Sequence, residues 1–343
     1  MAWSFGDSFD LYAAAADMAN GYWDSVGGTP GFVAGRFAGS QALAWLSTTY
    51  SLTKSSAIND AVHHLVVSFR QTAAISGTTL GSYFELFDGA TAQCSVVFRS
   101  DGAILLTSGG PAGTTLATYT GAFPVVNTWY AFEIEVVINN TTGSFSVRKN
   151  GNTVADFTAT ALDTQSSANA YANKLTVGMQ VAVSAQHIDD LFWRSDASSV
   201  AWLGDIRCYA RMPASDASVT FSRSTGASNF GCVDEAQQNA LTDYVFDSNP
   251  GDADFYGVAS IASTPATVIA TTTRAYMQKS DAGTRTGAVQ LKSGATTVAS
   301  PTLTLTTSGW VWAWRMDLTD PNTGAAWTPV AVNNATIGPK VIA

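Results

Sequence analysis

The residues best suited to metal binding or proton transfer lie in one short stretch, His187 to Asp196, which reads HIDDLFWRSD. A histidine beside two adjacent aspartates could bind a cation or exchange a proton. The stretch is also rich in large apolar residues, which predicts a β-strand, and successive side chains of a strand point to opposite faces. Asp189 and Asp190 would then diverge. We therefore interpret them as acids that shape the entry of a strand.

Glu133 and Glu135 form a second acidic pair, on one face of the predicted strand TWYAFEIEVVINN. Glycosidases use two carboxyl groups roughly 5 to 9 Å apart, and a pair at this spacing could supply them. Jelly-roll glycosidases carry a longer alternating run of acids, however, and Val137 stands where the third acid would be. We interpret the pair as part of a solvated sheet face, and we expect no catalytic residue and no enzymatic activity.

Two more pairs have simple structural interpretations. Asp252 and Asp254 alternate in a turn-rich segment that could offer oxygen ligands to calcium, but neither a third carboxylate nor an EF-hand spacing accompanies them, so we favour a turn. His63 and His64 are neighbours in a predicted strand and would point in opposite directions. The chain has no P-loop, dinucleotide-binding glycine pattern, nucleophile elbow or HExxH motif. We expect no cofactor and no metal site.

The composition predicts a neutral surface that is rich in hydroxyl groups. Only 13% of the 343 residues are charged, and the formal net charge is −9. Serine, threonine, alanine and glycine must therefore fill many exposed positions. No run of four or more basic residues occurs, and phosphate binding requires clustered Lys and Arg, so we expect no nucleic acid partner.

The cysteines and the first residues are typical of a protein made in a reducing compartment. Cys94, Cys208 and Cys232 are widely separated and odd in number, so we expect free, mostly buried thiols rather than a disulfide framework or a zinc site. The start of the chain lacks the basic and apolar regions of an export signal. No stretch approaches the roughly 20 apolar residues of a membrane span, so we expect none.

Alternation of apolar and polar residues with a period of two dominates the chain and predicts an all-β fold. In the clearest example, Tyr130 to Ile138, every second side chain is large and apolar. Asn150-Gly151 separates two predicted strands, Phe145–Lys149 and Thr153–Phe157, and predicts a type I′ hairpin. Asp101-Gly102 predicts a second hairpin.

The strand and turn signals restart near residue 204, which predicts two domains. We expect two antiparallel β-sandwiches of the jelly-roll type, residues 1–203 and 204–343, because this spacing of strands suits two sandwiches better than one very large barrel. Few short helices are expected, within residues 10–20 and 233–244.

Aromatic residues provide the candidate binding surface. Trp310, Trp312 and Trp314 share one face of the predicted strand GWVWAWRMDL, about 7 Å apart by strand geometry. Such a row can fill a sandwich core, form a subunit contact or stack on sugar rings, and these three alternatives stay open. Tyr22 and Trp23, in NGYWDSVGG, are candidates for the same glycan or subunit contact.

The segment from Trp129 to Gly151 resembles the core of a concanavalin A-like or laminin-G-like jelly roll, in which a tryptophan-led strand precedes an Asn-Gly hairpin. Ile188-Asp189-Asp190, followed by Gly204-Asp205-Ile206-Arg207, is similar to a late strand and its loop in tailed-bacteriophage virion structural proteins. Further similarity to such proteins lies in SFGDSFDLY, CVDEAQQNALTDYVFDSNPGDADFYG and DPNTGAAWTPVAVNNATIGPKV.

This resemblance implies a non-enzymatic virion structural protein that is assembled in the cytoplasm of the host bacterium. It would be exposed on the particle surface, in the tail or its adsorption apparatus, or as a capsid decoration such as a head fibre. Its partners would be other virion proteins and further copies of the chain in a homo-oligomer. The alternatives are a module that binds host surface polysaccharide and an enzyme that degrades polysaccharide.

Overall fold

The computed structural model describes residues 3–45, 50–180, 185–197, 201–237, 242–261 and 267–343. It confirms the all-β prediction, with 48% of residues in strands and 4% in helices. The short helix expected within residues 10–20 is α1 (Ala15–Met18). Residues 233–237 and 242–244 form no helix, and residues 238–241 of that expected helix lie outside the described part. Among the described residues, no helix has the length and apolar character that crossing a membrane requires.

The chain divides into two compact units. Unit 1 comprises Met1–Asp10, Ala14–Ala19 and Trp23–Cys208, and unit 2 comprises Leu11–Ala13, Asn20–Tyr22 and Tyr209–Ala343. Unit 2 therefore includes two short N-terminal pieces as well as the C-terminal part of the chain. The pattern of strands and turns in the sequence gave no sign of these pieces.

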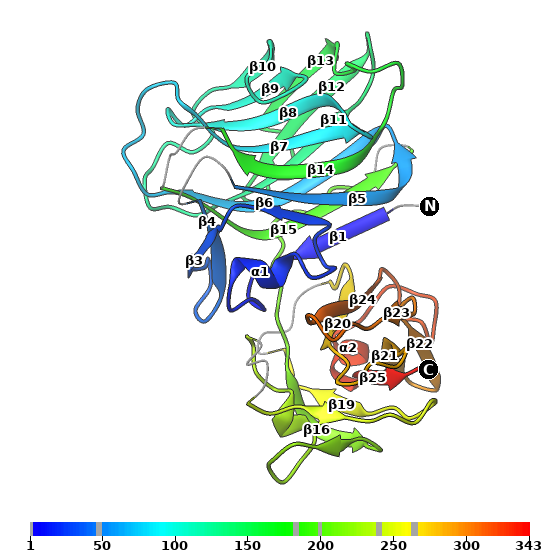
Figure 1. Cartoon of the computed structure of the whole chain (residues 1–343). Coiled ribbons are helices and arrows are strands. Elements are labelled where there is room, and N and C mark those ends of the chain that lie inside the picture. Colours follow the sequence, from blue (N-terminus) through cyan, green and yellow to red (C-terminus); the bar gives the residue numbers. More distant parts are fainter. Residues whose placement is uncertain (1–2, 46–49, 181–184, 198–200, 238–241, 262–266) are drawn as a thin grey trace. The chain divides into compact units, whose positions relative to one another are not determined.

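Unit 1 contains two large antiparallel sheets that face each other (Figure 1). Sheet A runs in the order β13 (Phe157–Leu162), β12 (Gly143–Lys149), β11 (Tyr130–Val137), β6 (Val62–Gln71), β15 (Gln186–Asp196), β4 (Gln41–Ala44) and β3 (Gly31–Ala34), with β1 (Trp3–Asp7) paired to β15. Sheet B runs in the order β10 (Thr115–Tyr119), β9 (Ile104–Ser108), β8 (Thr91–Arg99), β7 (Leu80–Asp88), β14 (Ala172–Met179), β5 (Ser51–Asp60) and β2 (Ser25–Gly27). The predicted hairpin at Asp101-Gly102 joins β8 to β9.

The core of unit 1 lies between the sheets and follows from alternation along each strand. On β11, Phe132, Ile134 and Val136 are fully buried, as predicted. Phe69 of sheet A and Phe98 of sheet B stack with their ring centroids 4.3 Å apart. Each such buried side chain stabilises the fold by about 1.5 to 3 kcal/mol. The opposite side of sheet A, which we call the polar face, presents Glu133, Glu135, His64, Ser68, Arg70, Arg148, His187, Asp189 and Arg194.

The predicted Asn-Gly turn forms, but the loop that contains it is longer than predicted. Asn150 and Gly151 have φ angles of +53° and +75°, the positive signs that a type I′ turn requires. The next strand begins at Phe157 instead of Thr153. The reason is that Asp156 accepts a backbone N–H from the end of β12 and so closes a wider loop.

The stretch from His187 to Asp196 forms most of β15, but this strand is not regular. Its pairing with β6 shifts between Asp189 and Phe192, and Asp190 has a φ angle of +50°. This bulge buries both aspartates, which are 1% and 2% exposed, in the middle of the strand. The prediction of a strand entry with strict face alternation is therefore wrong here, because the extra residue of a bulge reverses the faces that follow it.

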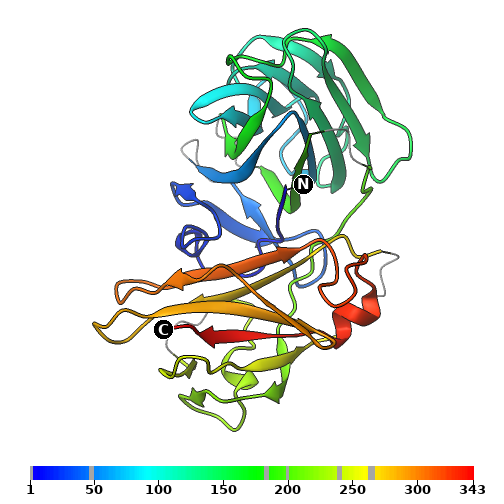
Figure 2. The ribbon, with the colours of Figure 1, turned by 90° about the vertical axis from the view of Figure 1, so that its right-hand side faces the viewer.

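Unit 2 is built from one sheet, two small ribbons and a short helix (Figure 2). Sheet C runs in the order β16 (Pro213–Ser218), β19 (Phe255–Val258), β25 (Thr336–Val341), β21 (Thr286–Ser293) and β22 (Thr296–Ala299), with β23 (Leu303–Thr304) paired to β21. The ribbons are β17 (Ser222–Arg223) with β18 (Val245–Phe246), and β20 (Thr271–Met277) with β24 (Val311–Asp317). The unit also contains the single turn η1 (Phe230–Cys232) and the helix α2 (Pro329–Asn334).

The apolar core of unit 2 is thin. Unit 2 contributes twelve of the 56 buried apolar side chains in the described part of the chain, ten from residues 209–343 and two, Tyr12 and Tyr22, from the N-terminal pieces. One cluster joins Leu291 of sheet C to Val332 of α2, together with Trp327 and Ala335. Most other apolar side chains of this unit are only half-buried.

Candidate functional site

The polar face of sheet A brings together charged side chains that lie far apart in the sequence. His64 lies between the two glutamates of β11, with Nε2 2.7 Å from Oε2 of Glu135 and Nδ1 3.9 Å from Oε1 of Glu133. Only the shorter distance is a hydrogen bond. Burial lowers the pKa of His64, but the two carboxylates outweigh this effect and leave its pKa raised. The glutamate pair therefore belongs to an ordered network and not to the solvated sheet face that was predicted.

A segment that follows β15 crosses this face, and we call it the strap (Trp202–Cys208). The backbone N–H groups of Leu203 and Gly204 donate to the two carboxylate oxygens of Glu133. Glu133 is only 3% exposed as a result. Its carboxylate holds the strap to the sheet.

Two cation–π contacts also bind the strap to neighbouring residues. The ring of Trp202 packs on the guanidinium of Arg148, 4.2 Å from the ring centroid, and meets His64 edge-on. Arg207 packs on the ring of Phe37 at 3.9 Å. Such cation–π contacts contribute roughly 0.5 to 1 kcal/mol each where they are partly exposed.

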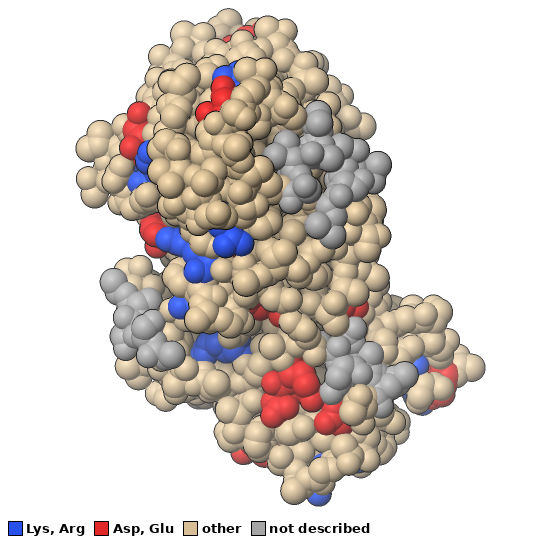
Figure 3. All heavy atoms as spheres, turned by 90° about the vertical axis from the view of Figure 1, so that its left-hand side faces the viewer, with Lys and Arg blue, Asp and Glu red and all other residues tan. Residues whose placement is uncertain are grey.

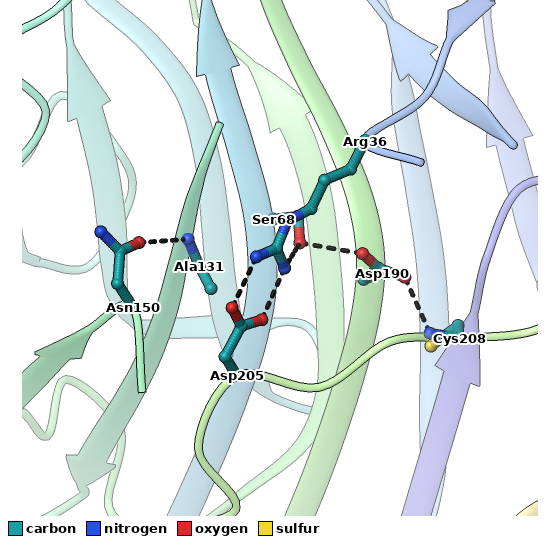
Figure 4. Close-up of polar contacts among 7 residues, drawn as sticks. All are labelled: Arg36, Ser68, Ala131, Asn150, Asp190, Asp205 and Cys208. Atoms are coloured by element: carbon teal, nitrogen blue, oxygen red, sulfur yellow. Dashed lines mark hydrogen bonds and ion pairs between the residues drawn. The ribbon is translucent and has the colours of Figure 1, made fainter. Parts of the chain in front are cut away.

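Arg36 is the centre of a polar network that fastens the middle and the end of the strap (Figure 4). Its guanidinium donates to both carboxylate oxygens of Asp205 at 2.5 Å, and Nη1 also donates to Oγ of Ser68 at 3.1 Å. The Ser68 hydroxyl donates to Oδ2 of Asp190 at 3.0 Å, and Oδ1 of Asp190 accepts the Cys208 N–H at 2.7 Å. One network therefore joins β6, β15 and the strap.

The two adjacent aspartates have strongly perturbed acidities. Oδ2 of Asp189 accepts the Arg36 N–H at 2.7 Å, and its Oδ1 accepts the Asp190 N–H at 2.8 Å. Burial raises the pKa of both aspartates, and the charge of Asp189 raises that of Asp190 further. Burial also raises the pKa of the nearby Asp10 to about 6. Among the described residues, no three His, Cys, Asp or Glu side chains gather as metal ligands.

A further group of residues lies at one end of the polar face, and we call it the Arg70 cluster (Arg70, Trp129 and His187). The guanidinium of Arg70 lies 4.6 Å from the ring centroid of Trp129 and donates to Nδ1 of His187 at 2.9 Å. Burial lowers the pKa of His187 to about 4, and the charge of Arg70 adds to this effect. The imidazole is therefore neutral at pH 7, and its Nε2 carries the hydrogen. The cluster is an aromatic platform edged by N–H donors.

Sequence analysis missed the Arg70 cluster and the pairing of Arg36 with Asp205. Arg70 and His187 are 117 positions apart, and Arg36 and Asp205 are 169 apart. Alternation places each side chain on a face of its own strand, but it does not reveal which strands are neighbours. Trp129 carries no local signal in the sequence beyond its place at the start of a strand.

The predicted indole row lies on the β20–β24 ribbon of unit 2. Trp312 is 7% exposed and stacks on Tyr276 with centroids 4.6 Å apart, and Trp310 stacks on the same tyrosine at 5.5 Å. Nε1 of Trp314 donates to the carbonyl oxygen of Gly21 at 3.1 Å. The middle of the row is used for packing within unit 2, whereas Trp310 and Trp314 are half-buried.

The other two aromatic candidates are fully buried. Tyr22 packs edge-on against Trp314 and lies under the guanidinium of Arg274, 3.6 Å from its ring centroid. Trp23 donates its Nε1–H to Oδ2 of Asp7 at 2.8 Å. Neither ring has a surface in this structure that a glycan could touch.

Charged groups are sparse on the surface. On the face that Figure 3 shows, most atoms belong to neither acidic nor basic residues, and the charged residues lie in several small, separate groups. The three cysteines are free, and Cys94 and Cys232 are buried. Burial raises the pKa of the Cys94 thiol, which makes it unreactive at neutral pH.

The contact between the Asn-Gly turn and the strap gives a first prediction. A methyl group at Gly151 would meet the Asp205 backbone nitrogen at 3.3 Å, whereas one at Gly121, with a similar φ of +66°, would meet nothing within 4 Å. Gly121→Ala should therefore cost only the backbone strain, about 1 kcal/mol. We expect Gly151→Ala to cost more in chemical denaturation and to speed amide exchange at Gly204 and Asp205. Equal effects of the two variants would show that the turn does not support the strap.

No family model matches the sequence, and no curated protein matches it. Solved structures with partial likeness include galectin LEC-6 of Caenorhabditis elegans, at 13% identity and a TM-score of 0.29, over 43% of this chain and 94% of that one. A carbohydrate esterase of bacteriophage phi24B has 16% identity and a TM-score of 0.35, over 50% and 89%. The CBM2 module of evolved Dit from Lactobacillus casei BL23 phage J-1 has 9% and 0.33, over 50% and 81%. All three TM-scores lie below 0.5.

Proposed function

We propose that this protein is a non-enzymatic carbohydrate-binding protein that works on the surface of a tailed-phage particle. The observation that supports binding is the Arg70 cluster, where an indole ring, a guanidinium and a neutral imidazole meet at one end of the polar face. Aromatic rings pack against the apolar sides of sugar rings, and N–H donors pair with hydroxyl oxygens. Ligand sites commonly combine an aromatic lining with a few such polar groups.

The state of the carboxylates supports binding over catalysis. Cleavage of a glycosidic bond needs two carboxyl groups that both reach the substrate. Glu133 accepts two N–H groups of the strap, and Glu135 bonds to His64. We expect the purified protein to release no reducing sugar from host polysaccharide. Release by the wild type that is lost in Glu133→Gln would contradict this part of the proposal.

A glycan array with the full chain tests the binding. We expect saturable binding to a limited set of glycans, weakened at least tenfold in Trp129→Ala. Trp310→Ala, which removes a half-buried indole of unit 2, is the matched control and should bind as the wild type does. The reverse pattern would assign binding to the indole row, and the absence of binding to any glycan would refute the proposed function.

A second candidate is a structural virion protein that assembles as a homo-oligomer, and the thin core of unit 2 favours it. Unit 2 supplies twelve of the 56 buried apolar side chains in the described part of the chain, while Val219, Tyr244 and Phe246 are 42%, 38% and 50% exposed. A unit of this size ordinarily buries a larger core. Further copies of the chain, or other virion proteins, would cover this apolar surface.

Two measurements test the second candidate. Mass spectrometry of purified virions should find the protein at a copy number set by the symmetry of the particle. Light scattering should give a mass that is a multiple of 35.9 kDa. A monomer in solution that is also absent from the particles would rule this candidate out.

A further inference from the structure

The polar face holds several buried donors that have no hydrogen-bond partner. In the described part of the chain, nine buried side-chain N or O atoms have no hydrogen-bond partner, and four of them lie on this face. These four are Nδ1 of His64 and the Nε atoms of Arg70, Arg148 and Arg194. Native structures contain few such atoms, because burying a donor without a partner is destabilising. Their concentration on one face points to a ligand rich in acceptor oxygens.

The strap covers part of this face through contacts that a ligand could replace. The described strap residues pair with no strand, so the strap lacks the backbone ladder that holds a sheet together. The ion pair of Arg36 with Asp205 is partly exposed, with the side chains 16% and 35% accessible. Exposed ion pairs contribute little to stability. Lifting the strap would uncover Arg148 and His64, on which the ring of Trp202 now packs.

We propose that the polar face beneath the strap is a binding site for an acidic saccharide, and that the strap occupies this site until the ligand displaces it. The carboxylate of Asp205, held by two hydrogen bonds from Arg36, uses the same chemistry as a uronic acid carboxylate would. Arg148 and Arg194 would supply further donors. The proposal rests on the proposed function and names its class of ligand.

Four acids lie on or beside the same face, Glu133, Glu135, Asp189 and Asp190. Glu135 stays bonded to His64, whereas lifting the strap removes the Leu203 and Gly204 N–H groups that Glu133 accepts. Four arginines, Arg36, Arg70, Arg148 and Arg194, lie on or beside the face with these acids. A ligand carboxylate would therefore pair locally with the Arg36 guanidinium that Asp205 leaves, instead of being drawn by a net positive charge.

The test compares trigalacturonic acid with its neutral counterpart, galactotriose, by isothermal titration calorimetry on the full chain. Asp205→Asn weakens the ion pair of Arg36 with Asp205 that holds the strap to the sheet. Asp101→Asn is the matched control, because Asp101 forms a similarly exposed pair with Arg99, with the side chains 22% and 29% accessible. We expect Asp205→Asn to bind trigalacturonic acid about fivefold more tightly than the wild type, which corresponds to about 1 kcal/mol. Adding Arg148→Gln should remove the gain.

Hydrogen exchange provides the second readout. Amides 203–206 should exchange faster in Asp205→Asn, and Asp101→Asn should leave their exchange unchanged. Faster exchange without tighter binding of trigalacturonic acid would show that the strap covers no binding site. Unchanged exchange would show that Asp205 does not hold the strap to the sheet. Either result overturns this proposal. If the wild type binds glycans through Trp129 in the array, the proposed function stands in both cases.

Discussion

Asp254→Ala is expected to destabilise unit 2 by about 3 kcal/mol or more. The side chain of Asp254 is fully buried. Its Oδ1 accepts the N–H groups of Thr220 and Phe221 at 2.7 and 2.9 Å. Its Oδ2 accepts from Nδ2 of Asn229 at 2.9 Å and from the Tyr256 hydroxyl at 2.5 Å. Removing the carboxylate leaves four donors without a partner, each at a cost of roughly 1 to 3 kcal/mol unless water replaces it.

Asp252→Ala is the matched control for this prediction, because the carboxylate of Asp252, two positions earlier, is half-buried and its Oδ2 accepts a hydrogen bond from Nδ2 of Asn249 at 3.2 Å. Calorimetry should show that Asp254→Ala lowers the transition of unit 2, while Asp252→Ala has an effect below about 0.5 kcal/mol. Hydrogen exchange should rise at Thr220 and Phe221. Equal stability of the two variants would mean that Asp254 does not organise the loop around it.

The different surroundings of Asp252 and Asp254 show what a local sequence pattern does not predict. The sequence placed Asp252 and Asp254 in a turn. Asp252 directly follows such a turn, whereas Asp254 directly precedes β19 and follows the bridge residue Ala253. The local pattern gave no reason to separate the two acids, since they alternate in the same segment. The difference arises from Thr220 and Asn229, which are 34 and 25 positions away from Asp254.

The strands themselves were largely predictable, because alternation depends only on neighbours in the chain. The apolar positions of Tyr130 to Ile138 are buried as expected, and the turns at Asp101-Gly102 and Asn150-Gly151 form with positive φ at their glycines. The bulge in β15 was not predictable, because a bulge follows from the pairing with β6. A prediction that starts from regular strands cannot contain it.

The candidate site was less predictable than the strands, for the same physical reason. The His64–glutamate network and the Arg70 cluster each join strands of sheet A that are far apart in the sequence. The Arg36 network also needs the strap in place. Asp205 and Arg207 belonged to a segment that resembled phage proteins, but their partners Arg36 and Phe37 gave no signal in the sequence. The residue types of the sequence point instead to the indoles of unit 2, because indole rings carry a large apolar area.

The free energy of unfolding of Asp190→Asn is expected to increase relative to that of the wild type as the pH rises. The pKa of Asp190 is raised by burial and by the charge of Asp189. The fold therefore binds this proton more tightly than the unfolded chain does. The stabilising contribution of the protonated group is complete below the ordinary pKa near 4 and is lost as the pH rises through the raised value. Asparagine stays neutral, and its oxygen can still accept the Cys208 N–H.

The measured quantity is the free energy of unfolding of the variant minus that of the wild type, which should grow by about 2 kcal/mol between pH 5 and pH 8. Taking this difference cancels the pH dependence that other groups contribute equally to both proteins. His63 is one such group, because burial lowers its pKa to about 4 and its contribution to stability is lost as the pH falls. Asp101→Asn is the control, because the hydrogen bonds with Arg99 lower the pKa of Asp101 from an ordinary value that already lies below this pH range. A difference for Asp190→Asn that stays flat over this range would mean that Asp190 is ionised in the fold and is fully compensated by Ser68, Cys208 and Arg36.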